Sequence, residues 1–420
     1  MKITAPPAGA RTNLEILDLA DPELYVSGDA HLAWQTLRAE QPVFWQRQES
    51  RPGFWAVTRY QDVRRVLRDH ETFTSECGTA ISMLGTVDAA AGKMMQATDP
   101  PRHKQFRDQL GRPLAPHAVS DHAGDIRLFV RQAIAPARDL DNWDAAAAFT
   151  RVPMQVAALF MGLPEADVDQ LLRLSFAALA PLDPHYRLGS EKVTLRHSHH
   201  QIINYFDRRL RELQANPGHC LISHLIGIKI DGQPLTQEEL LLNCLSMTLG
   251  AVVTTSQAVS ATMIALAEQG CGEGHWSPDT PVPAAVEEAL RWSSPTTHFM
   301  RRARRDVELH GVTIRTGEPV TSWIASANRD ESVFDQACVL DLARAPNRHL
   351  SFGSGPHRCI GSPTARLVLR TVFEELFANV ECFELTGPAE HLVSNEIAGV
   401  VSLPVRVRVR PGARLGGLWA

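Results

Sequence analysis

Closely spaced cysteine pairs are absent from this 420-residue sequence. The seven cysteines, at positions 77, 220, 244, 271, 338, 359 and 382, are scattered, odd in number and never spaced as CxxC. Disulfide frameworks and structural zinc sites both need cysteines in pairs, so neither is indicated. Scattered, unpaired cysteines are typical of a protein from a reducing compartment.

An excess of charge and long apolar runs are also missing. Lys plus Arg number 42 and Asp plus Glu 47, so the net charge of -5 provides no general attraction to nucleic acid or to an anionic membrane. The N-terminal residues lack the apolar core of a secretory signal, and no apolar run reaches the roughly 18 residues that span a bilayer. We therefore expect a cytoplasmic protein that binds neither nucleic acid nor a membrane.

No internal repeat and no Ser/Gly-rich linker divides the chain. Length alone suggests two or three domains at roughly 150 residues each, but the missing boundaries predict one interlocked domain over residues 1–420. Apolar residues three to four apart predict helices, and alternating residues predict a few short strands. The predicted helical segments are 63–67, 126–134, 168–178 and 202–213, and the strands are 54–58, 307–314, turning at Gly311, and 403–409. The predicted fold class is mainly α with a small β region.

One predicted helix is longer and more apolar than the others. It begins at Leu235, where Thr236 and Glu239 form a capping box, and continues through Leu266. About 30 residues give a helix roughly 45 Å long, and a helix that is apolar on every side must cross the centre of the protein. Small and hydroxyl residues interrupt it at 250–255. The hydroxyls of Thr254 and Thr255 either donate to carbonyl oxygens of the preceding helical turn or are free to contact a bound group.

A glycine-rich loop near the C-terminus presents one cysteine to a helix. The segment Ser351-Phe-Gly-Ser-Gly-Pro-His-Arg-Cys-Ile-Gly361 is followed by a helix with Pro at its second position. Backbone N–H donors and the helix dipole stabilise a thiolate there, and Gly353, Gly355 and Gly361 allow positive φ and the close approach of a flat ligand. Cys359 is therefore a candidate metal ligand. The alternative is a buried structural cysteine in a turn.

This segment resembles the haem-binding signature of the cytochrome P-450 family, Phe-Gly-x-Gly-x-His-x-Cys-x-Gly, at every fixed position. The resemblance implies the cytochrome P-450 fold of the soluble bacterial type, with the long central helix over the haem. It implies heme b, iron protoporphyrin IX, as cofactor, with Cys359 as the iron ligand and Phe352, Gly353, His357 and Gly361 binding the cofactor. It also implies a haem-thiolate monooxygenase that uses O2 and two electrons.

Further matches to the family concern charged residues. His103 and Arg107, one helical turn apart, and Arg301 would hold the haem propionates together with His357. Two carboxylates carried into an apolar pocket need cations or hydrogen-bond donors. The resemblance therefore predicts that these four side chains lie close together.

A second charged group resembles the family's Glu-x-x-Arg pair. Glu288 and Arg291 lie at helical spacing and would form a buried ion network with Arg344, behind the haem. The alternative is an ordinary pair on a helix surface. Residues 328–330, Asn-Arg-Asp, match the loop that precedes the haem signature.

The central helix departs from the family at one chemical position. The family usually reads Ala-Gly-x-Asp/Glu-Thr-Thr, whereas here Val253 stands in the place of the acid before Thr254 and Thr255, and Gly250-Ala251 inverts the small pair. These residues are the candidate catalytic segment, because in the family a Thr hydroxyl and a carboxylate deliver the protons that O–O cleavage consumes. Two chemistries stay open. One is C–H hydroxylation with another water path, and the other is oxidative C–C or C–N bond formation in which the substrate's own N–H or O–H provides the proton route.

The resemblance also predicts which residues line the substrate pocket. Most are apolar or small, which fits a small organic substrate of secondary-metabolite biosynthesis. His298 is an exception that either contacts a polar group of the substrate or is a structural histidine. The predicted lining residues are Ile81, Met83, Leu84, Met95, Leu179, Val253, Thr296, Thr297, His298, Phe299, Val400 and Val401.

Electrons must come from outside the chain, because no flavin domain is visible. The resemblance implies a ferredoxin-type donor with a reductase, and a basic patch of Arg102, Lys104, Arg348, Arg358 and Arg366 would suit an acidic partner. The alternative is a set of merely solvated charges. A haem gas sensor would not need Thr254, and a peroxide-driven relative would carry an Arg in the central helix, so the sequence favours a monooxygenase.

Overall fold

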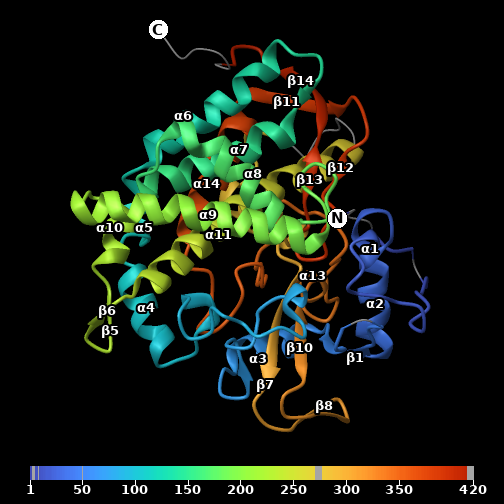
Figure 1. Ribbon diagram of the computed structural model, residues 1–420. Coiled ribbons are helices and arrows are strands. Elements are labelled where there is room, and N and C mark those ends of the chain that lie inside the picture. The colour runs from blue at the N-terminus through green and yellow to red at the C-terminus, as the bar shows by residue number, and fades with distance from the viewer. Residues whose placement is uncertain (2–4, 8, 50, 270–276, 414–420) are drawn as a thin grey trace.

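The computed structural model describes residues 1, 5–7, 9–49, 51–269 and 277–413, except for the side chain of residue 253. Helices make up about 47% of the chain, and Figure 1 shows most of them gathered on one side, with α1 to α3 and the main sheet on the other. The predicted class, mainly α with a small β region, is confirmed. The prediction that rests on the side chain of Val253 lies outside the described residues, as does Cys271.

The helices are α1 (Glu23–Val26), α2 (Ala30–Glu40), α3 (Tyr60–Arg68), α4 (Arg102–Leu110), α5 (Pro116–Ser120), α6 (Ala123–Ile134), α7 (Ala145–Met161), α8 (Val168–Leu179), α9 (Glu191–Ala215), α10 (Leu221–Ile226), α11 (Gln237–Gln269), α12 (Val282–Ser293), α13 (Ile324–Ala327) and α14 (Ser362–Asn379). The strands are β1 (Val43–Gln46), β2 (Phe54–Val57), β3 (Phe73–Thr74), β4 (Trp143–Asp144), β5 (Lys229–Ile230), β6 (Gln233–Pro234), β7 (His298–Ala303), β8 (Val307–Leu309), β9 (Val312–Ile314), β10 (Pro319–Trp323), β11 (Val380–Leu385), β12 (Glu390–His391), β13 (Val400–Ser402) and β14 (Pro404–Val409).

The long helix α11 runs through the middle of the protein and packs most extensively against α7. Its predicted capping box is confirmed. Thr236 donates its N–H and its hydroxyl to Glu239 Oε2 at 2.8 and 2.9 Å, and the Glu239 N–H donates to Thr236 Oγ1 at 3.3 Å. By length and composition α11 could cross a membrane, so the expectation that no segment qualifies is corrected. However, 71% of its most apolar window is buried inside the protein, as in the core helix of a soluble protein.

The main sheet joins segments that are far apart in the sequence. Its strand order is β1-β2-β10-β7-β3, with β2 and β10 parallel and the other neighbours antiparallel. The predicted turn at Gly311 is confirmed, with φ of 75° between the paired strands β8 and β9. Strands β7 and β10 were not predicted. They are largely buried on both faces, so the alternation that marks a half-exposed strand is absent.

Five cysteines among the described residues are free, at positions 77, 220, 244, 338 and 359. Cys382 on β11 is disulfide-bonded, which the sequence analysis did not predict. The spacing of cysteines along the chain does not show which of them come within bonding distance in the fold. One such bond is still far from a disulfide framework.

Candidate active site

The loop before α14 is shaped by backbone hydrogen bonds and two glycines. The Cys359 N–H donates to Phe352 O at 2.7 Å, and the Gly353 N–H donates to Leu350 O at 2.7 Å. Gly353 and Gly355 have φ of 69° and 76°, as predicted. A Cβ at Gly355 would lie 2.7 Å from the Cα of Arg68, at the end of α3, so only glycine lets the loop approach that helix.

Gly361 behaves differently from its predicted role. Its φ is -81°, so the prediction of a positive φ is wrong there. Gly361 is instead the N-cap residue of α14, with Pro363 in the first turn as predicted. Its N–H is a hydrogen-bond donor toward the Cys359 thiol and lowers the pKa of that thiol. The loop therefore holds Cys359 at the start of a helix.

The Cys359 thiol is both accessible and desolvated. The residue is exposed, yet burial raises the pKa of its thiol, against the Gly361 N–H and the cations Arg107, Arg358 and Arg366, which lower it. The N–H and the three cations favour the thiolate, the form that binds metals.

The four residues predicted to bind propionates cluster near this cysteine. The rings of His103 and His357 are 4.2 Å apart. Burial lowers the pKa of His103 to about 3, and the charges of His357 and Arg107 add to this effect. Burial also lowers the pKa of His357, and the positive charges of Arg301 and Arg107 lower it further. Both rings are therefore neutral hydrogen-bonding groups near pH 7.

Arg301 is a buried cation that forms no ion pair with a described acid, although the charge of Asp99 acts on it. Its guanidinium donates to Met300 O at 2.8 Å, and burial lowers its pKa to about 10. Neither Arg301 nor Arg107 makes an ion pair with any acid in the described part of the chain. Because a buried guanidinium is costly without a counter-charge, this arrangement favours an added anion. Arg301 lies inside strand β7.

Asp99 completes this cluster and was missed by sequence reasoning. It accepts from the Thr74 hydroxyl at 2.5 Å and from the Ser75 N–H at 3.1 Å, and it pairs with Arg304 at 2.6 Å. Burial opposes its ionisation, but the His357 ring 3.8 Å away and hydrogen bonds from Thr74 and Ser75 outweigh burial and lower the pKa of Asp99 to about 2. Its position directly before Pro100 and Pro101 gave no indication of partners that lie elsewhere in the sequence.

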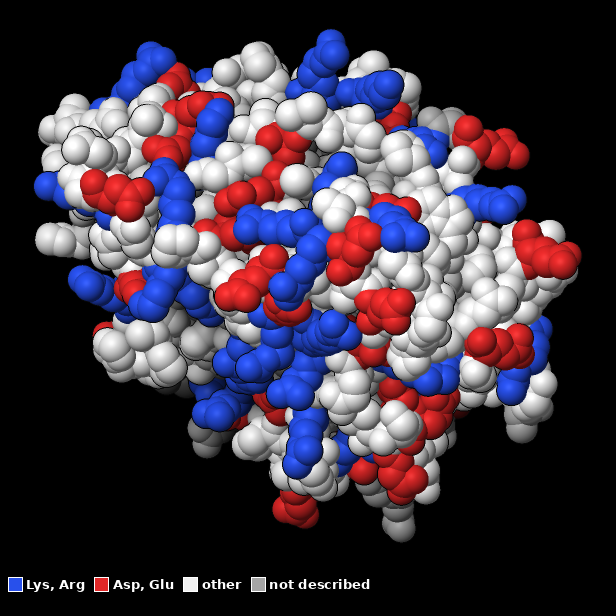
Figure 2. Space-filling view, turned by 90° about the horizontal axis from the view of Figure 1, so that it is seen from below, with Lys and Arg blue, Asp and Glu red and all other residues white. Residues whose placement is uncertain are grey.

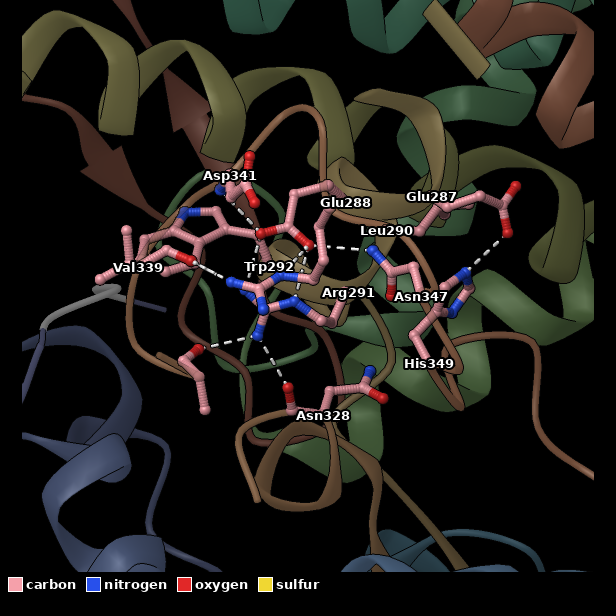
Figure 3. A network of polar contacts seen from close by, with 12 residues as sticks. Glu287, Glu288, Leu290, Arg291, Trp292, Asn328, Val339, Asp341, Asn347 and His349 are labelled. Atoms are coloured by element: carbon pink, nitrogen blue, oxygen red, sulfur yellow. Dashed lines mark hydrogen bonds and ion pairs between the residues drawn. The ribbon is translucent and has the colours of Figure 1, made fainter. Parts of the chain in front are cut away.

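The structure brings together the three residues of the predicted ion network, and Figure 3 shows Glu288 and Arg291 at its centre. Arg291 meets both oxygens of Glu288 at 2.7 and 2.8 Å, and Arg344 Nε lies 3.1 Å from Glu288 Oε2. The Asn347 amide and the Asp341 N–H also donate to Glu288, both at 2.9 Å. The remaining Arg291 donors reach the carbonyl oxygens of residues 328, 337 and 339. Glu288 and Arg291 are fully buried, so the surface-pair alternative is excluded.

The middle of α11 differs from the rest of that helix. Thr248 and Thr262 donate their hydroxyls to the carbonyls four residues earlier, at 2.9 and 2.8 Å. Thr254 and Thr255 make no side-chain hydrogen bond to any described residue, so the back-bonding alternative is not what the structure shows. Gly250 is exposed, and a Cβ there would meet nothing within 4 Å. Together with half-buried Ala251, it leaves this helix open in its middle.

Three of the predicted pocket segments are joined to one another. Thr296 bridges Ile397, and the Thr297 hydroxyl donates to Asn395 O at 2.5 Å. Loop residues 81–83 reach the same 393–399 turn through Ser82. The other predicted lining residues are buried or half-buried, namely Ile81, Met83, Leu84, Met95, Leu179, Phe299, Val400 and Val401.

The side chain of His298 packs against other residues of the protein. It is the first residue of β7, and its Nδ1 lies 2.9 Å from the Thr297 hydroxyl. Its ring packs 4.7 Å from the ring of Trp323 and is buried. The structure therefore favours the structural alternative over contact with the substrate. Glu396, in contrast, was not predicted, although an acid within an otherwise small and apolar stretch was a signal for it.

Acidic residues already pair with some of the side chains in the predicted basic patch. Arg102 pairs with Glu239 and Asp231, Lys104 pairs with Asp108, and Arg366 lies 2.6 Å from Glu287. Arg348 and Arg358 are exposed and make no ion pair with a described residue. Figure 2 shows Lys and Arg side chains massed on one face of the molecule.

A surface hollow adds arginines that the sequence analysis did not name. It is lined by Arg64, Arg65 and Arg68 of α3, with Gln61 and Asp69. The three arginines are exposed and have no ion pair with any acid that the structure describes. They lie beside the cysteine loop, since Gly355 packs on Arg68.

Comparisons with known proteins agree with this arrangement. The family model described as Cytochrome P450 matches residues 281–409. Cytochrome P450 NovI of Streptomyces niveus is 33% identical over 408 residues, 96% of this chain and 98% of the relative. Linalool 8-monooxygenase of Pseudomonas putida is 31% identical over 93% of this chain and 99% of its own length. The crystal structure of P450 OxyD, which is involved in the biosynthesis of vancomycin-type antibiotics, has a TM-score of 0.82 at 32% identity and covers 94% of this chain and 100% of its own.

Proposed function

The chain belongs to the cytochrome P450 family and is an enzyme of the monooxygenase type, and on that premise we propose that it hydroxylates a C–H bond of a small organic molecule in a biosynthetic pathway. NovI and OxyD, one of which serves the biosynthesis of an antibiotic class, support the biosynthetic role. The largely apolar segments 79–84 and 396–401 support a small organic substrate.

Family membership implies a cysteine-ligated haem. We assign Cys359 as the ligand of heme b, with Phe352, Gly353 and Gly361 shaping the loop beside it. His103, Arg107, Arg301 and His357 would receive the two propionates. When bound, the haem would supply O2 activation with two electrons. The described residues fit this group, because the thiol is accessible and two guanidiniums lack acids.

The observation that carries the assignment is the Cys359 thiol, accessible at the start of α14 and beside cations. The test is the absorption spectrum of the reduced protein under CO. We expect the band that marks thiolate ligation. Haem-loaded protein without that band would contradict the assignment.

Thr254 supports hydroxylation over other chemistries. Its hydroxyl has no partner among the described residues and lies in the open middle of α11, so it is available to donate a hydrogen bond and to pass a proton. Oxidative C–C or C–N bond formation is the second candidate, favoured by the sequence alone, in which Val253 replaces the acid. Mass spectrometry of the product separates them, since hydroxylation adds one oxygen atom whereas coupling removes hydrogen atoms.

The proposed electron donor is a ferredoxin-type protein that receives electrons from a reductase. Its docking surface would comprise Arg348 and Arg358 together with Arg64, Arg65 and Arg68, because these arginines are exposed and not neutralised by described acids. Arg102, Lys104 and Arg366 are left out, since acids already pair with them. Reduction by an acidic ferredoxin should slow as ionic strength rises. A rate insensitive to salt would argue against this surface.

We also propose that residues 1–420 form one haem-thiolate domain in the cytoplasm. Sheet pairing supports a single domain, because β2 from the N-terminal part pairs with β10, and β4 pairs with β14 near the C-terminus. The burial of α11 supports a location away from the membrane. Limited proteolysis of the haem-loaded protein should give no two stable halves.

A further inference from the structure

Glu396 differs from three other acids of this protein in how it is paired. Asp99, Glu287 and Glu331 each pair with an arginine, and each has a lowered pKa. Glu396 makes no ion pair with any Lys, Arg or His that the structure describes. Burial raises the pKa of Glu396, and the hydrogen bonds that it accepts from Ser82 offset only part of that effect.

The position of Glu396 is that of a pocket residue. It lies in the turn between β12 and β13, and its carboxylate accepts from the Ser82 hydroxyl at 2.6 Å and from the Ser82 N–H at 3.4 Å. Its backbone oxygen accepts from the Thr297 N–H at 2.9 Å. One residue thus links the three segments that carry Ile81, Thr297 and Val400, all assigned above to the substrate pocket.

Apart from Ser82, the neighbouring residues are apolar, and no Lys, Arg or His in the described part of the chain pairs with the carboxylate. Ile81, Ile397 and Ala398 next to it are buried, while Glu396 itself is half-buried. The charged side chain that it senses is another acid, Glu191, which is itself held by Arg51 at 2.8 Å. A carboxylate in such a place is costly unless a cation compensates it. The described residues provide a hydroxyl and an N–H, but no cation that pairs with this carboxylate.

We propose that Glu396 binds a positively charged nitrogen of the substrate, so that this enzyme acts on a small organic cation such as an amine. This inference rests on the proposed monooxygenase function and deepens it. Ser82 orients the carboxylate, and the apolar residues around it bind the carbon skeleton. Glu396 is then a specificity-determining residue that anchors one end of the substrate.

The test uses two probes of similar size and different charge. Phenylbutyltrimethylammonium carries a permanent positive charge and cannot ligate iron, whereas phenylbutanol is neutral. Both are titrated into the haem-loaded protein, and their dissociation constants are measured by the change in haem absorbance. We expect tighter binding of the cation. Glu396→Gln should weaken binding of the cation by about ten- to hundredfold, as expected for losing a poorly solvated charge pair, with little effect on the alcohol.

Two control variants separate charge from structure. Glu390→Gln removes an exposed acid from the same hairpin, one that has no contact with Ser82, and should leave the preference for the cation unchanged. Ser82→Ala removes the hydrogen bond and keeps the charge, so the preference should survive it. If Glu396→Gln left the ratio of the two dissociation constants unchanged, or weakened the binding of both probes equally, Glu396 would only connect two loops through its hydrogen bonds. The proposal would then fail.

Failure of the proposed function would look different. Each variant is also reduced and treated with CO, and the thiolate band reports on Cys359 independently of either probe. A normal CO spectrum with no preference for the cation refutes the role of Glu396 alone. A missing thiolate band in the unmodified protein refutes the haem-thiolate assignment, on which this role depends.

Discussion

Polar side chains around Glu288 and polar side chains on the substrate side of the protein differ in how many hydrogen-bond and ion-pair partners they have. Around Glu288, two arginines, an amide and a backbone N–H occupy both carboxylate oxygens. On the substrate side, Thr254 has no hydrogen bond to a described residue, and Glu396 has no described cation. The pairings around Glu288 hold the fold, whereas the Thr254 hydroxyl and the Glu396 carboxylate are available to a ligand.

Arg291 and Arg301 show the same difference between two buried arginines. Arg291 is bonded to Glu288 and to three backbone carbonyls. Arg301 has one hydrogen bond, to a neighbouring carbonyl, and burial lowers its pKa. The first guanidinium is satisfied by the chain alone, and the second is left for an anion such as a propionate.

Replacing the proposed iron ligand should have the largest effect. Cys359→Ser removes the thiol, so we expect complete loss of the thiolate band in the reduced CO spectrum and of turnover. Cys77→Ser is the matched control, because Cys77 is also free but lies outside the loop. Retention of the band in haem-loaded Cys359→Ser would show that another residue ligates the iron.

Breaking the ion network around Glu288 should have the second largest effect. Glu288→Ala leaves Arg291 buried without its acid, which costs about 3 to 5 kcal/mol in the free energy of unfolding. We expect loss of haem and of soluble protein, measured by expression yield and haem content. Glu287→Ala on the same helix is the control and should cost only about 1 kcal/mol, since its pair with Arg366 is partly exposed. A folded, haem-loaded Glu288→Ala protein without turnover would indicate a catalytic role instead.

Substitutions in the middle of α11, where Thr254 has no described hydrogen-bond partner, should change turnover rather than stability. Thr254→Ala should reduce product per electron pair, with a loss in rate of about 10² to 10⁴ if its hydroxyl passes protons. Thr248→Ala is the control, because that hydroxyl bonds back to Cys244 O. Val253→Asp should improve coupling. Little harm from Thr254→Ala, with no gain from Val253→Asp, would favour a proton route through the substrate.

The smallest expected effect concerns Asp99 and acid stability. The pKa of Asp99 is about 2 in the folded protein, below its ordinary value of 3.8. The carboxylate therefore stabilises the fold above about pH 4, and this contribution, about 2 kcal/mol, is lost as the pH falls toward 2. In urea unfolding between pH 5 and pH 3, Asp99→Asn should depend less on pH than the unmodified protein. Equal pH dependence of the two proteins would contradict the assigned pairing.

Local patterns were sufficient for part of the fold and the site. The capping box of α11, the turn at Gly311 and the positive φ of Gly353 and Gly355 follow from residues close together in the sequence. They could be predicted because their geometry depends on backbone conformation and on neighbours within a few residues. Strands β7 and β10 could not, because burial on both faces removes the alternating pattern.

The sequence by itself determined the family resemblance, the candidate ligand Cys359 and the residue types of the Glu288 network. Only the tertiary structure decided which polar groups are paired. It placed His298 against Trp323, gave Asp99 its partners and left Glu396 beside Ser82 without an ion pair to any described residue. Pairing depends on contacts between segments that lie up to hundreds of residues apart, and on the desolvation that those contacts cause. Neither quantity is encoded in the spacing of residues along the chain.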